Sequence, residues 1–266
     1  MKTELNEACA LVVGGASGIG KACVEGFLQE GCRVIMWDVR PDVQQTATEL
    51  HADRCVGFSV DISDGSAVQQ AVDASREVFG PIQHLVHAAA IGSGKFGAPY
   101  TRLQPSDWHR VLDVNINGMV NVAHAIAPGM VARRSGTMVF VASVAGQIGS
   151  PTDPPYSASK AANINFAQVM AKDLARDGVR VNTVCPGMVK TPLNRRVWQS
   201  WNDRLTDAEK LSYDDWAAQK IDQLVPLGRW QQPEDVANMV VFLSSNLAAQ
   251  VTGQTINVDG GYVMHW

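Results

Sequence analysis

Tyr156 and Lys160 are the residues of this sequence whose types and spacing point most directly to chemistry. Four positions apart, they would lie on one face of a helix, one turn from each other. A free tyrosine has a pKa of about 10, which is too high for a base at neutral pH, but a nearby ammonium lowers it. The pair therefore predicts a phenol that accepts and returns a proton. The plain alternative is a surface tyrosine beside a solvated lysine.

Ser143 lies thirteen residues before Tyr156, just after an apolar run that ends at Val141. Its hydroxyl could orient a carbonyl or carbinol oxygen toward the phenol. Alternatively, it could help to form a turn before Gly146. Next to Tyr156 and Lys160, the first interpretation is favoured.

A glycine-rich turn lies far upstream of these residues. The apolar run Leu11–Val13 leads straight into Gly14, and glycines follow at positions 18 and 20. Glycines here allow a tight turn, a close approach to phosphate oxygens and a helix whose free N–H groups face the phosphates. The spacing is GxxxGxG rather than GxGxxG. Directly after a strand, it predicts a bound dinucleotide.

Asp38 ends the second apolar run, eighteen residues after Gly20. A carboxylate there can accept hydrogen bonds from both hydroxyls of the adenosine ribose, and it repels a 2′-phosphate. This favours NAD over NADP, although Arg40 is close by and a solvated aspartate is the plain alternative. The turn and the tyrosine–lysine pair together predict hydride transfer to or from the nicotinamide of NAD.

Short apolar runs alternate with helical patterns and provide the elements that must position these residues. Continuous apolar strands separated by helices are typical of a parallel sheet covered on both faces. Asp64 suits the N-cap of one helix, and Pro233 suits the first turn of another. We expect one α/β, doubly wound (Rossmann) domain over residues 1–266, with a seven-stranded parallel sheet whose strands lie near residues 10–13, 33–37, 56–60, 84–86, 137–141, 179–184 and 255–258.

The segment 192–230 departs from this rhythm, because it is polar, charged and rich in tryptophan, with no strand signal. We expect a helical insertion that forms much of the substrate pocket as a lid. Trp198 and Trp201 could line the pocket and suit an apolar or cyclic alcohol. Arg195 and Arg196 could instead bind a carboxylate or phosphate. A sugar or polyol is a further possibility, and an exposed helix face is the plain alternative for each.

Composition narrows the class of protein. The chain has 266 residues, of which 46% are hydrophobic, and a formal net charge of −4, which gives no reason to expect nucleic acid or an anionic membrane as partner. Its five cysteines form no CxxC pair and suggest buried free thiols. The polar amino terminus and the lack of a long apolar stretch favour a soluble, cytoplasmic protein. No metal site is predicted.

From Leu11 to Tyr262 the chain resembles the short-chain dehydrogenase/reductase family. The resemblance implies a catalytic tetrad of Asn115, Ser143, Tyr156 and Lys160, in which the asparagine kinks a helix and holds a water of the proton relay. It also implies a homotetramer. The cofactor contacts that it implies, together with those argued above, come from Gly14, Ser17, Gly18, Ile19, Gly20, Asp38, Asp61, Ile62, Ala88, Tyr156, Lys160, Val189 and Thr191.

Two positions depart from the family pattern. Val13 stands where the family usually has threonine, and His87-Ala88-Ala89-Ala90 stands where it favours Asn-Asn-Ala-Gly. Both changes remove side chains that brace the cofactor floor. We expect Ala88 to contact the adenosine ribose through its backbone, and His87 to be a packed residue rather than a catalytic one.

The expected reaction is the interconversion of a secondary alcohol and a ketone. Tyr156 is the acid and base, and the substrate is a small molecule. The nearest alternative is an NADPH-dependent reductase of 3-oxoacyl thioesters or ketones, which Asp38 argues against. A dinucleotide-binding sensor without catalysis is a more remote alternative, because no member of the implied tetrad is missing.

Overall fold

The seven apolar runs form strands whose ends lie within two residues of the predicted ones. The structure is a computed structural model, and it describes residues 2–264. All strands are parallel, in the order β3-β2-β1-β4-β5-β6-β7, so the predicted α/β sheet is confirmed. The strands are β1 (Cys9–Val13), β2 (Arg33–Asp38), β3 (Cys55–Ser59), β4 (His84–His87), β5 (Gly136–Val141), β6 (Val179–Pro186) and β7 (Thr255–Val258).

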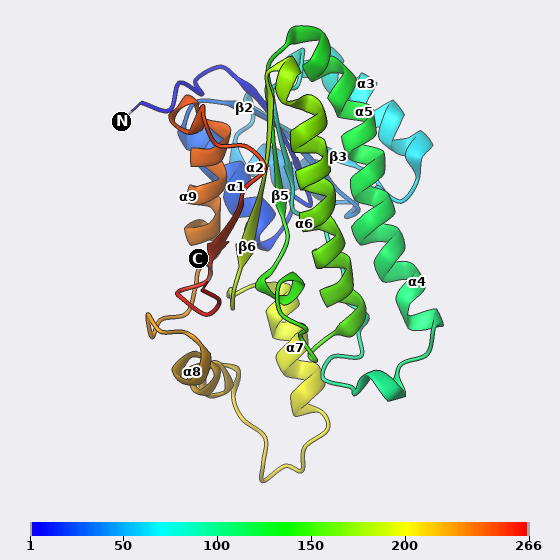
Figure 1. The fold of residues 1–266 in the computed structure, drawn as a ribbon, viewed down its shortest axis with the longest axis vertical. Helices are drawn as coiled ribbons and strands as arrows, with labels where there is room; N and C mark the ends of the chain where they lie inside the picture. Colours follow the sequence, from blue (N-terminus) through cyan, green and yellow to red (C-terminus); the bar gives the residue numbers. More distant parts are fainter. Residues whose placement is uncertain (1, 265–266) are drawn as a thin grey trace.

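Helices cover both faces of this sheet, because successive strand residues point to opposite sides and both sides are apolar. In β1, Leu11 and Val13 belong to one buried cluster and Val12 belongs to the other. One face is covered by α1 (Gly18–Gln29), α2 (Val43–Leu50) and α9 (Pro233–Ser244), and the other by α3 (Gly65–Phe79), α4 (Ser106–Leu112), α5 (Gly118–Arg133) and α6 (Pro154–Leu174) (Figure 1).

Local signals fix the starts of two of these helices, as the sequence predicts. The Asp64 carboxylate accepts hydrogen bonds from the backbone N–H groups of Ser66 and Ala67, at 2.9 and 3.1 Å, and so caps α3. Pro233 occupies the first turn of α9, where its missing N–H leaves no hydrogen bond unmade. Capping therefore sets where these helices begin, while burial sets how they pack.

The strand order reverses direction between β1 and β4, which are neighbours in the sheet but far apart in the chain. In open parallel sheets, ligands bind outside the carboxyl ends of the strands at such a switch point. The glycine turn follows β1, Ala88 follows β4, and Ser143 follows β5 at this same edge. The topology therefore brings together residues that the chain separates by more than a hundred positions.

The segment between β6 and β7 forms α7 (Pro192–Asn202) and α8 (Tyr213–Leu224), beyond the carboxyl ends of the strands (Figure 1). Its aromatic residues build a small apolar cluster of their own. Tyr213 is at its centre, with ring centroids 5.5 Å from Trp198, 6.2 Å from Trp216 and 4.8 Å from Trp230. The insertion is thus helical, as predicted, and its role as a lid remains a prediction.

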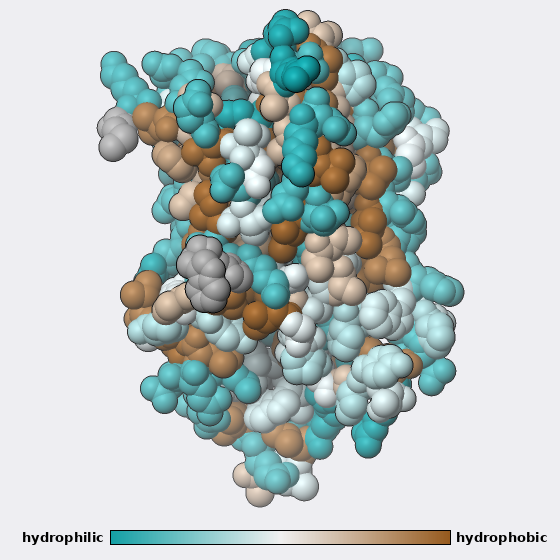
Figure 2. All heavy atoms as spheres, viewed as in Figure 1, coloured by the Kyte–Doolittle hydropathy of each residue, from teal (hydrophilic) through white to brown (hydrophobic). Residues whose placement is uncertain are grey.

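The surface and the thiols agree with the composition. The face in Figure 2 mixes hydrophilic and hydrophobic residues, and within residues 2–264 no helix combines the length and apolar character needed to cross a membrane. The five cysteines are free and buried, as expected. Burial raises the pKa of Cys23 to about 12, so this thiol stays protonated and unreactive at neutral pH.

Candidate active site

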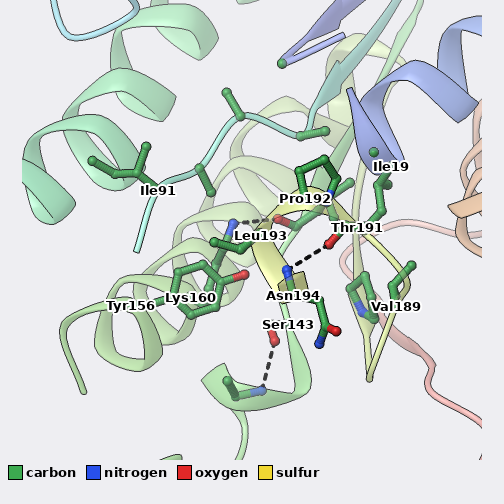
Figure 3. Close-up of a pocket in the computed structure, with 18 of the residues that line it drawn as sticks. Ile19, Ile91, Ser143, Tyr156, Lys160, Val189, Thr191, Pro192, Leu193 and Asn194 are labelled. Atoms are coloured by element: carbon green, nitrogen blue, oxygen red, sulfur yellow. Dashed lines mark hydrogen bonds between the residues drawn. The ribbon is translucent and has the colours of Figure 1, made fainter. Parts of the chain in front are cut away.

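Ser143, Tyr156 and Lys160 line one cavity of about 730 Å³, together with the glycine turn and parts of α7 and α8. Ser143 follows β5, whereas Tyr156 and Lys160 share a face of α6 (Figure 3). The cavity extends from Asp38 at one end to Trp216 and Lys220 of α8 at the other. Its length and position suit a dinucleotide with a small substrate beyond it.

Lys160 is held at the end of β5. Its Nζ donates a hydrogen bond of 2.8 Å to the backbone carbonyl of Val141, and it lies 5.5 Å from the centroid of the Tyr156 ring. The side chain is only 2% exposed. Burial lowers its pKa to about 8, because the charged form loses hydration. The lysine is therefore a positioned ammonium whose charge is sensitive to mildly alkaline pH.

Burial also decides the pKa of Tyr156. Loss of hydration raises it well above its usual value, and the negative charges of Asp153 and Cys185 raise it further. A hydrogen bond with the Ser143 hydroxyl acts in the opposite direction. The net shift is upward, so the expectation of a pKa lowered by Lys160 is wrong for the protein by itself. Tyr156 is a protonated phenol over a wide range of pH.

The Ser143 hydroxyl combines the two roles that the sequence left open. Its Oγ accepts a hydrogen bond of 3.1 Å from the backbone N–H of Ala145 and so begins the short 3₁₀ turn Val144–Gly146. The same hydroxyl hydrogen-bonds to the Tyr156 phenol. The turn therefore fixes the oxygen of Ser143 beside the phenol, where it can orient a carbonyl or carbinol oxygen.

Asn115 lies behind the cavity wall rather than on it. It sits in a π-helical turn, Asp113–Asn117, which joins α4 to α5 and supplies the implied irregularity in the helix. Its side chain accepts from the N–H of Ile91 and donates to the carbonyl of Ile91 and to Ser159 Oγ, each at 2.9 Å. It thus ties the segment after β4 to α6, and its part in a water relay stays a prediction.

Asn163 is a second buried amide that the sequence analysis missed. Its Nδ2 donates a hydrogen bond of 2.8 Å to the backbone carbonyl of Asn115, which the π-helical turn leaves available. Asn163 is three positions after Lys160 and therefore close to its face of α6. The sequence did offer a signal for it, because an amide three positions after Lys160 falls near the same face of the helix. Asn163 positions the helix that carries Tyr156 and Lys160.

The glycine turn leaves no room for side chains. Gly14 has a φ of +80°, and a Cβ on it would lie 2.6 Å from the backbone nitrogen of Ala89. A Cβ on Gly20 would lie 2.0 Å from the carbonyl oxygen of Gly14. Ser17 precedes α1, and its side chain makes no capping hydrogen bond. The first N–H groups of α1 and the hydroxyl of Ser17 therefore suit dinucleotide phosphates. Ile19 lies beside them on the cavity wall (Figure 3).

Replacement of Gly20 by alanine tests this close packing. We expect Gly20→Ala to lower the free energy of unfolding by about 2 kcal/mol, because its Cβ meets backbone that must shift. Urea unfolding measures the loss, and titration with NADH should show weaker binding. Gly149→Ala is the matched control, since a Cβ there meets nothing within 4 Å. Equal stability of the two variants would contradict the close approach.

Asp38 and Asp61 lie toward the same end of the cavity. Asp38 accepts hydrogen bonds from the backbone N–H groups of Ala16, at 3.0 Å, and Arg40, at 3.2 Å. The Arg40 guanidinium pairs with Asp42, with Nε 2.9 Å from Oδ1. Asp61 binds Arg110 at 3.2 Å, and hydrogen bonds from Ser63 help to hold the pKa of Asp61 below its usual range. Ile62 follows Asp61 on the cavity wall.

The residues that depart from the family pattern, Val13 and residues 87–90, lie at or beside the middle of the cavity floor. Val13 is buried on the cavity wall, and its carbonyl accepts a hydrogen bond of 2.8 Å from the N–H of Ala88. His87 points into the core, with its ring centroid 6.0 Å from that of Phe140. Burial lowers the pKa of His87 to about 3. His87 is therefore a neutral packed residue, unsuited to acid–base work near pH 7.

Val189 and Thr191 lie where the chain leaves β6, beside the glycine turn (Figure 3). Val189 forms an isolated parallel bridge with Gln231, and the Gln231 side chain accepts from Gly187 N, at 3.1 Å, and donates to the Val258 carbonyl, at 2.6 Å. Thr191 caps α7 by accepting from Asn194 N at 3.2 Å. Gln231 is a positioning residue that the sequence analysis missed, because its partners lie far away in the chain.

The structure separates the candidates for substrate contacts. Trp198 and Trp201 pack in the cluster around Tyr213 and are not among the residues that line the cavity. Arg195 also points away, with its guanidinium 4.6 Å from the centroid of the Tyr213 ring. Arg196 does line the cavity. The other residues of this end include Phe96, Ile148, Asp153, Asn194, Val197, Trp216, Lys220, Leu224 and Tyr262.

Comparisons with known proteins agree with this geometry. A family model described as enoyl-(acyl carrier protein) reductase matches residues 14–263. The 3-oxoacyl-[acyl-carrier-protein] reductase of Thermotoga maritima is 34% identical over 265 residues, which cover 98% of this chain and all of that protein.

Two solved structures are also similar. The L-sorbose reductase of Gluconobacter frateurii, complexed with NADPH and L-sorbose, is 28% identical, has a TM-score of 0.90 and covers both chains fully. A 3-oxoacyl-[acyl-carrier protein] reductase of Brucella melitensis with bound NAD is 31% identical, with a TM-score of 0.85, and the match covers 99% of this chain and 95% of that one.

Proposed function

This chain belongs to the short-chain dehydrogenase/reductase family, and we propose that within it the protein is an NAD-dependent dehydrogenase of secondary alcohols. It is an oxidoreductase of the alcohol and ketone class that uses a nicotinamide dinucleotide. The single observation that carries the finer proposal is the carboxylate of Asp38 on the cavity wall, with Arg40 held by Asp42. The carboxylate of Asp38 would repel the 2′-phosphate of NADP and so weaken its binding.

The side chains of the cavity support a simple division of labour. The nicotinamide supplies the hydride acceptor for alcohol oxidation when the dinucleotide is bound. Tyr156, as phenolate, accepts the proton of the substrate hydroxyl, and Ser143 orients the oxygen and stabilises its charge. Lys160, whose Nζ is held by the Val141 carbonyl, favours the phenolate by its charge and, in this proposal, contacts the nicotinamide ribose. Asn115 holds α6 against the segment after β4.

The assay that tests the proposal is reduction of NAD⁺ by the purified protein with a panel of secondary alcohols, sugars, polyols and hydroxy acids, repeated with NADP⁺. The proposal expects turnover with NAD⁺ and little with NADP⁺. Strong preference for NADPH with an acyl thioester would support the 3-oxoacyl reductase, a second candidate favoured by the identity to the Thermotoga protein. Dinucleotide binding without any turnover would support the non-catalytic sensor. Native mass spectrometry would test the homotetramer.

The raised pKa of Tyr156 gives the proposal a pH dependence. Oxidation needs the phenolate, so kcat/KM for an alcohol should rise with pH, by about tenfold per unit while the phenol is mostly protonated. Lys160, whose pKa burial lowers to about 8, loses its positive charge in the same region, so the rise should become shallower there. Ketone reduction needs the protonated phenol and should not rise. Initial rates in both directions measure this, and a flat oxidation profile would contradict it.

A further inference from the structure

The basic residues between positions 190 and 230 divide into two groups. Five of them have a partner within the protein: Lys190 with Asp214 and the Trp230 ring, Arg195 with the Tyr213 ring, Arg204 with the Phe96 carbonyl, Lys210 with Asp207, and Arg229 with Asp235. The other two, Arg196 of α7 and Lys220 of α8, have no ion pair, hydrogen bond or ring contact among the described residues. These two are the ones that line the cavity. Within this segment, the two cations without a partner are thus the two on the cavity wall, where Arg196 is exposed and Lys220 is half-buried.

Trp216 is an aromatic residue on the same wall. It precedes Lys220 by four positions, so the two lie on one face of α8, and both line the cavity. The side chain is buried, with 6% of the residue exposed, and its Nε1 makes no hydrogen bond to any described residue. A buried N–H without an acceptor is costly. Two helices thus place two cations and one aromatic ring on the wall of one cavity.

One carboxylate shares the substrate end of the cavity with the two cations. Three of the described cavity residues are acidic, and Asp38 and Asp61 lie toward the adenosine end. The third, Asp153, precedes α6, and its Oδ2 accepts a hydrogen bond of 2.9 Å from the backbone N–H of Ser93. The neighbours of Arg196 and Lys220 on the wall include the apolar side chains of Val197 and Leu224. Apolar walls strengthen the attraction between a cation and a bound anion.

We propose that the substrate is a secondary alcohol that carries an anionic oxygen group, such as a carboxylate, bound by Arg196 and Lys220. This rests on the proposed function and deepens it. Guanidinium and ammonium groups bind carboxylate and phosphate oxygens by charge-assisted hydrogen bonds, the stronger class. The alternative is that Arg196 and Lys220 bind the pyrophosphate of the dinucleotide instead, and the experiment below distinguishes these two cases.

The experiment uses three hydroxy acids that differ in the distance between the hydroxyl and the carboxylate: 3-hydroxybutanoate, 4-hydroxypentanoate and 5-hydroxyhexanoate. Each acid is compared with its neutral methyl ester. We expect the wild type to favour at least one acid over its ester by about tenfold or more in kcat/KM. Arg196→Gln and Lys220→Gln should each lower kcat/KM for that acid by about tenfold and change the ester by less than about twofold. Lys210→Gln, which removes a cation paired with Asp207 on the surface, is the control and should change neither.

Two binding measurements complete the test. Quenching of protein fluorescence gives the Kd for NADH of each variant. If Arg196→Gln and Lys220→Gln raise this Kd and leave the acid-to-ester ratio unchanged, the cations serve the dinucleotide and the proposal is wrong. Calorimetry with each acid and ester added to the NADH complex needs no turnover, so it decides the proposal even if no alcohol is oxidised and the proposed function fails. Equal binding of every acid and its ester would overturn the proposal alone.

Discussion

The Tyr156→Phe variant should oxidise its best alcohol about 10³-fold more slowly than the wild type, with most of the loss in kcat. The substitution removes only the phenol oxygen and leaves the ring on α6, with Lys160 and its hydrogen bond to the Val141 carbonyl in place. The proton of the substrate hydroxyl then has no acceptor, because the phenol oxygen next to Ser143 is missing. Steady-state rates measure the loss, and NADH titration should show a Kd close to that of the wild type.

Two further readouts separate loss of the proton acceptor from damage to the fold. The substitution keeps the ring and removes only the hydroxyl at the cavity wall, so thermal unfolding should stay nearly unchanged, as it should in Gly149→Ala. The residual activity of Tyr156→Phe should also lose the rise with pH that the wild type shows, because the titrating group is gone. Wild-type kcat, or an unaltered pH profile at reduced rate, would assign the proton to another group.

The sheet could be predicted from the sequence because its cause is local. The strands β1, β2, β4 and β5 are mostly apolar and buried, so the run alone identifies them, whereas β7 at the edge of the sheet is only half-buried. The capping of α3 by Asp64 is equally local, since the carboxylate reaches N–H groups two and three residues ahead. The glycine turn is local only in part, because Gly20 packs against the Gly14 carbonyl, whereas Gly14 itself packs against Ala89, far away in the chain.

The pKa of Tyr156 could not be predicted in this way. Four-residue spacing gave the distance to Lys160, and this alone suggested a lowered value. The upward shift comes from burial under segments distant in the chain, and no periodicity of α6 encodes it. The link between Asn115 and Asn163 has the same origin, since a π-helical turn must first free a carbonyl for the amide.

The substrate end was the hardest part to predict, and Arg195 and Arg196 show why. Adjacent residues on a helix point about 100° apart, so one of the pair can face the cavity and the other cannot. Which one does so depends on the Tyr213 ring, eighteen positions further on, against which Arg195 packs. The aromatic cluster similarly withdraws Trp198 and Trp201 and leaves Trp216 on the wall. Tertiary packing chose among side chains that look equivalent in sequence.

Asp38→Asn should lower the ratio of kcat/KM for NAD⁺ to kcat/KM for NADP⁺ by about 100-fold. The substitution keeps an acceptor oxygen for one of the two N–H groups that Asp38 binds, those of Ala16 and Arg40, and it removes the charge that opposes a 2′-phosphate. It also weakens the hydrogen bonds to the ribose hydroxyls, so the efficiency with NAD⁺ should fall while that with NADP⁺ rises. Initial rates with both dinucleotides, at saturating alcohol, measure the ratio.

Asp42→Asn is the matched control, because it removes a carboxylate from the same loop that does not line the cavity. Alone it should change the ratio little, since Asp38 still repels the phosphate. Combined with Asp38→Asn it should lower the ratio further, because Arg40 loses its ion pair and becomes free to bind the 2′-phosphate. A double variant no better with NADP⁺ than Asp38→Asn would show that Arg40 has no part in the choice. An unchanged ratio in Asp38→Asn itself would place the choice of dinucleotide elsewhere in the cavity.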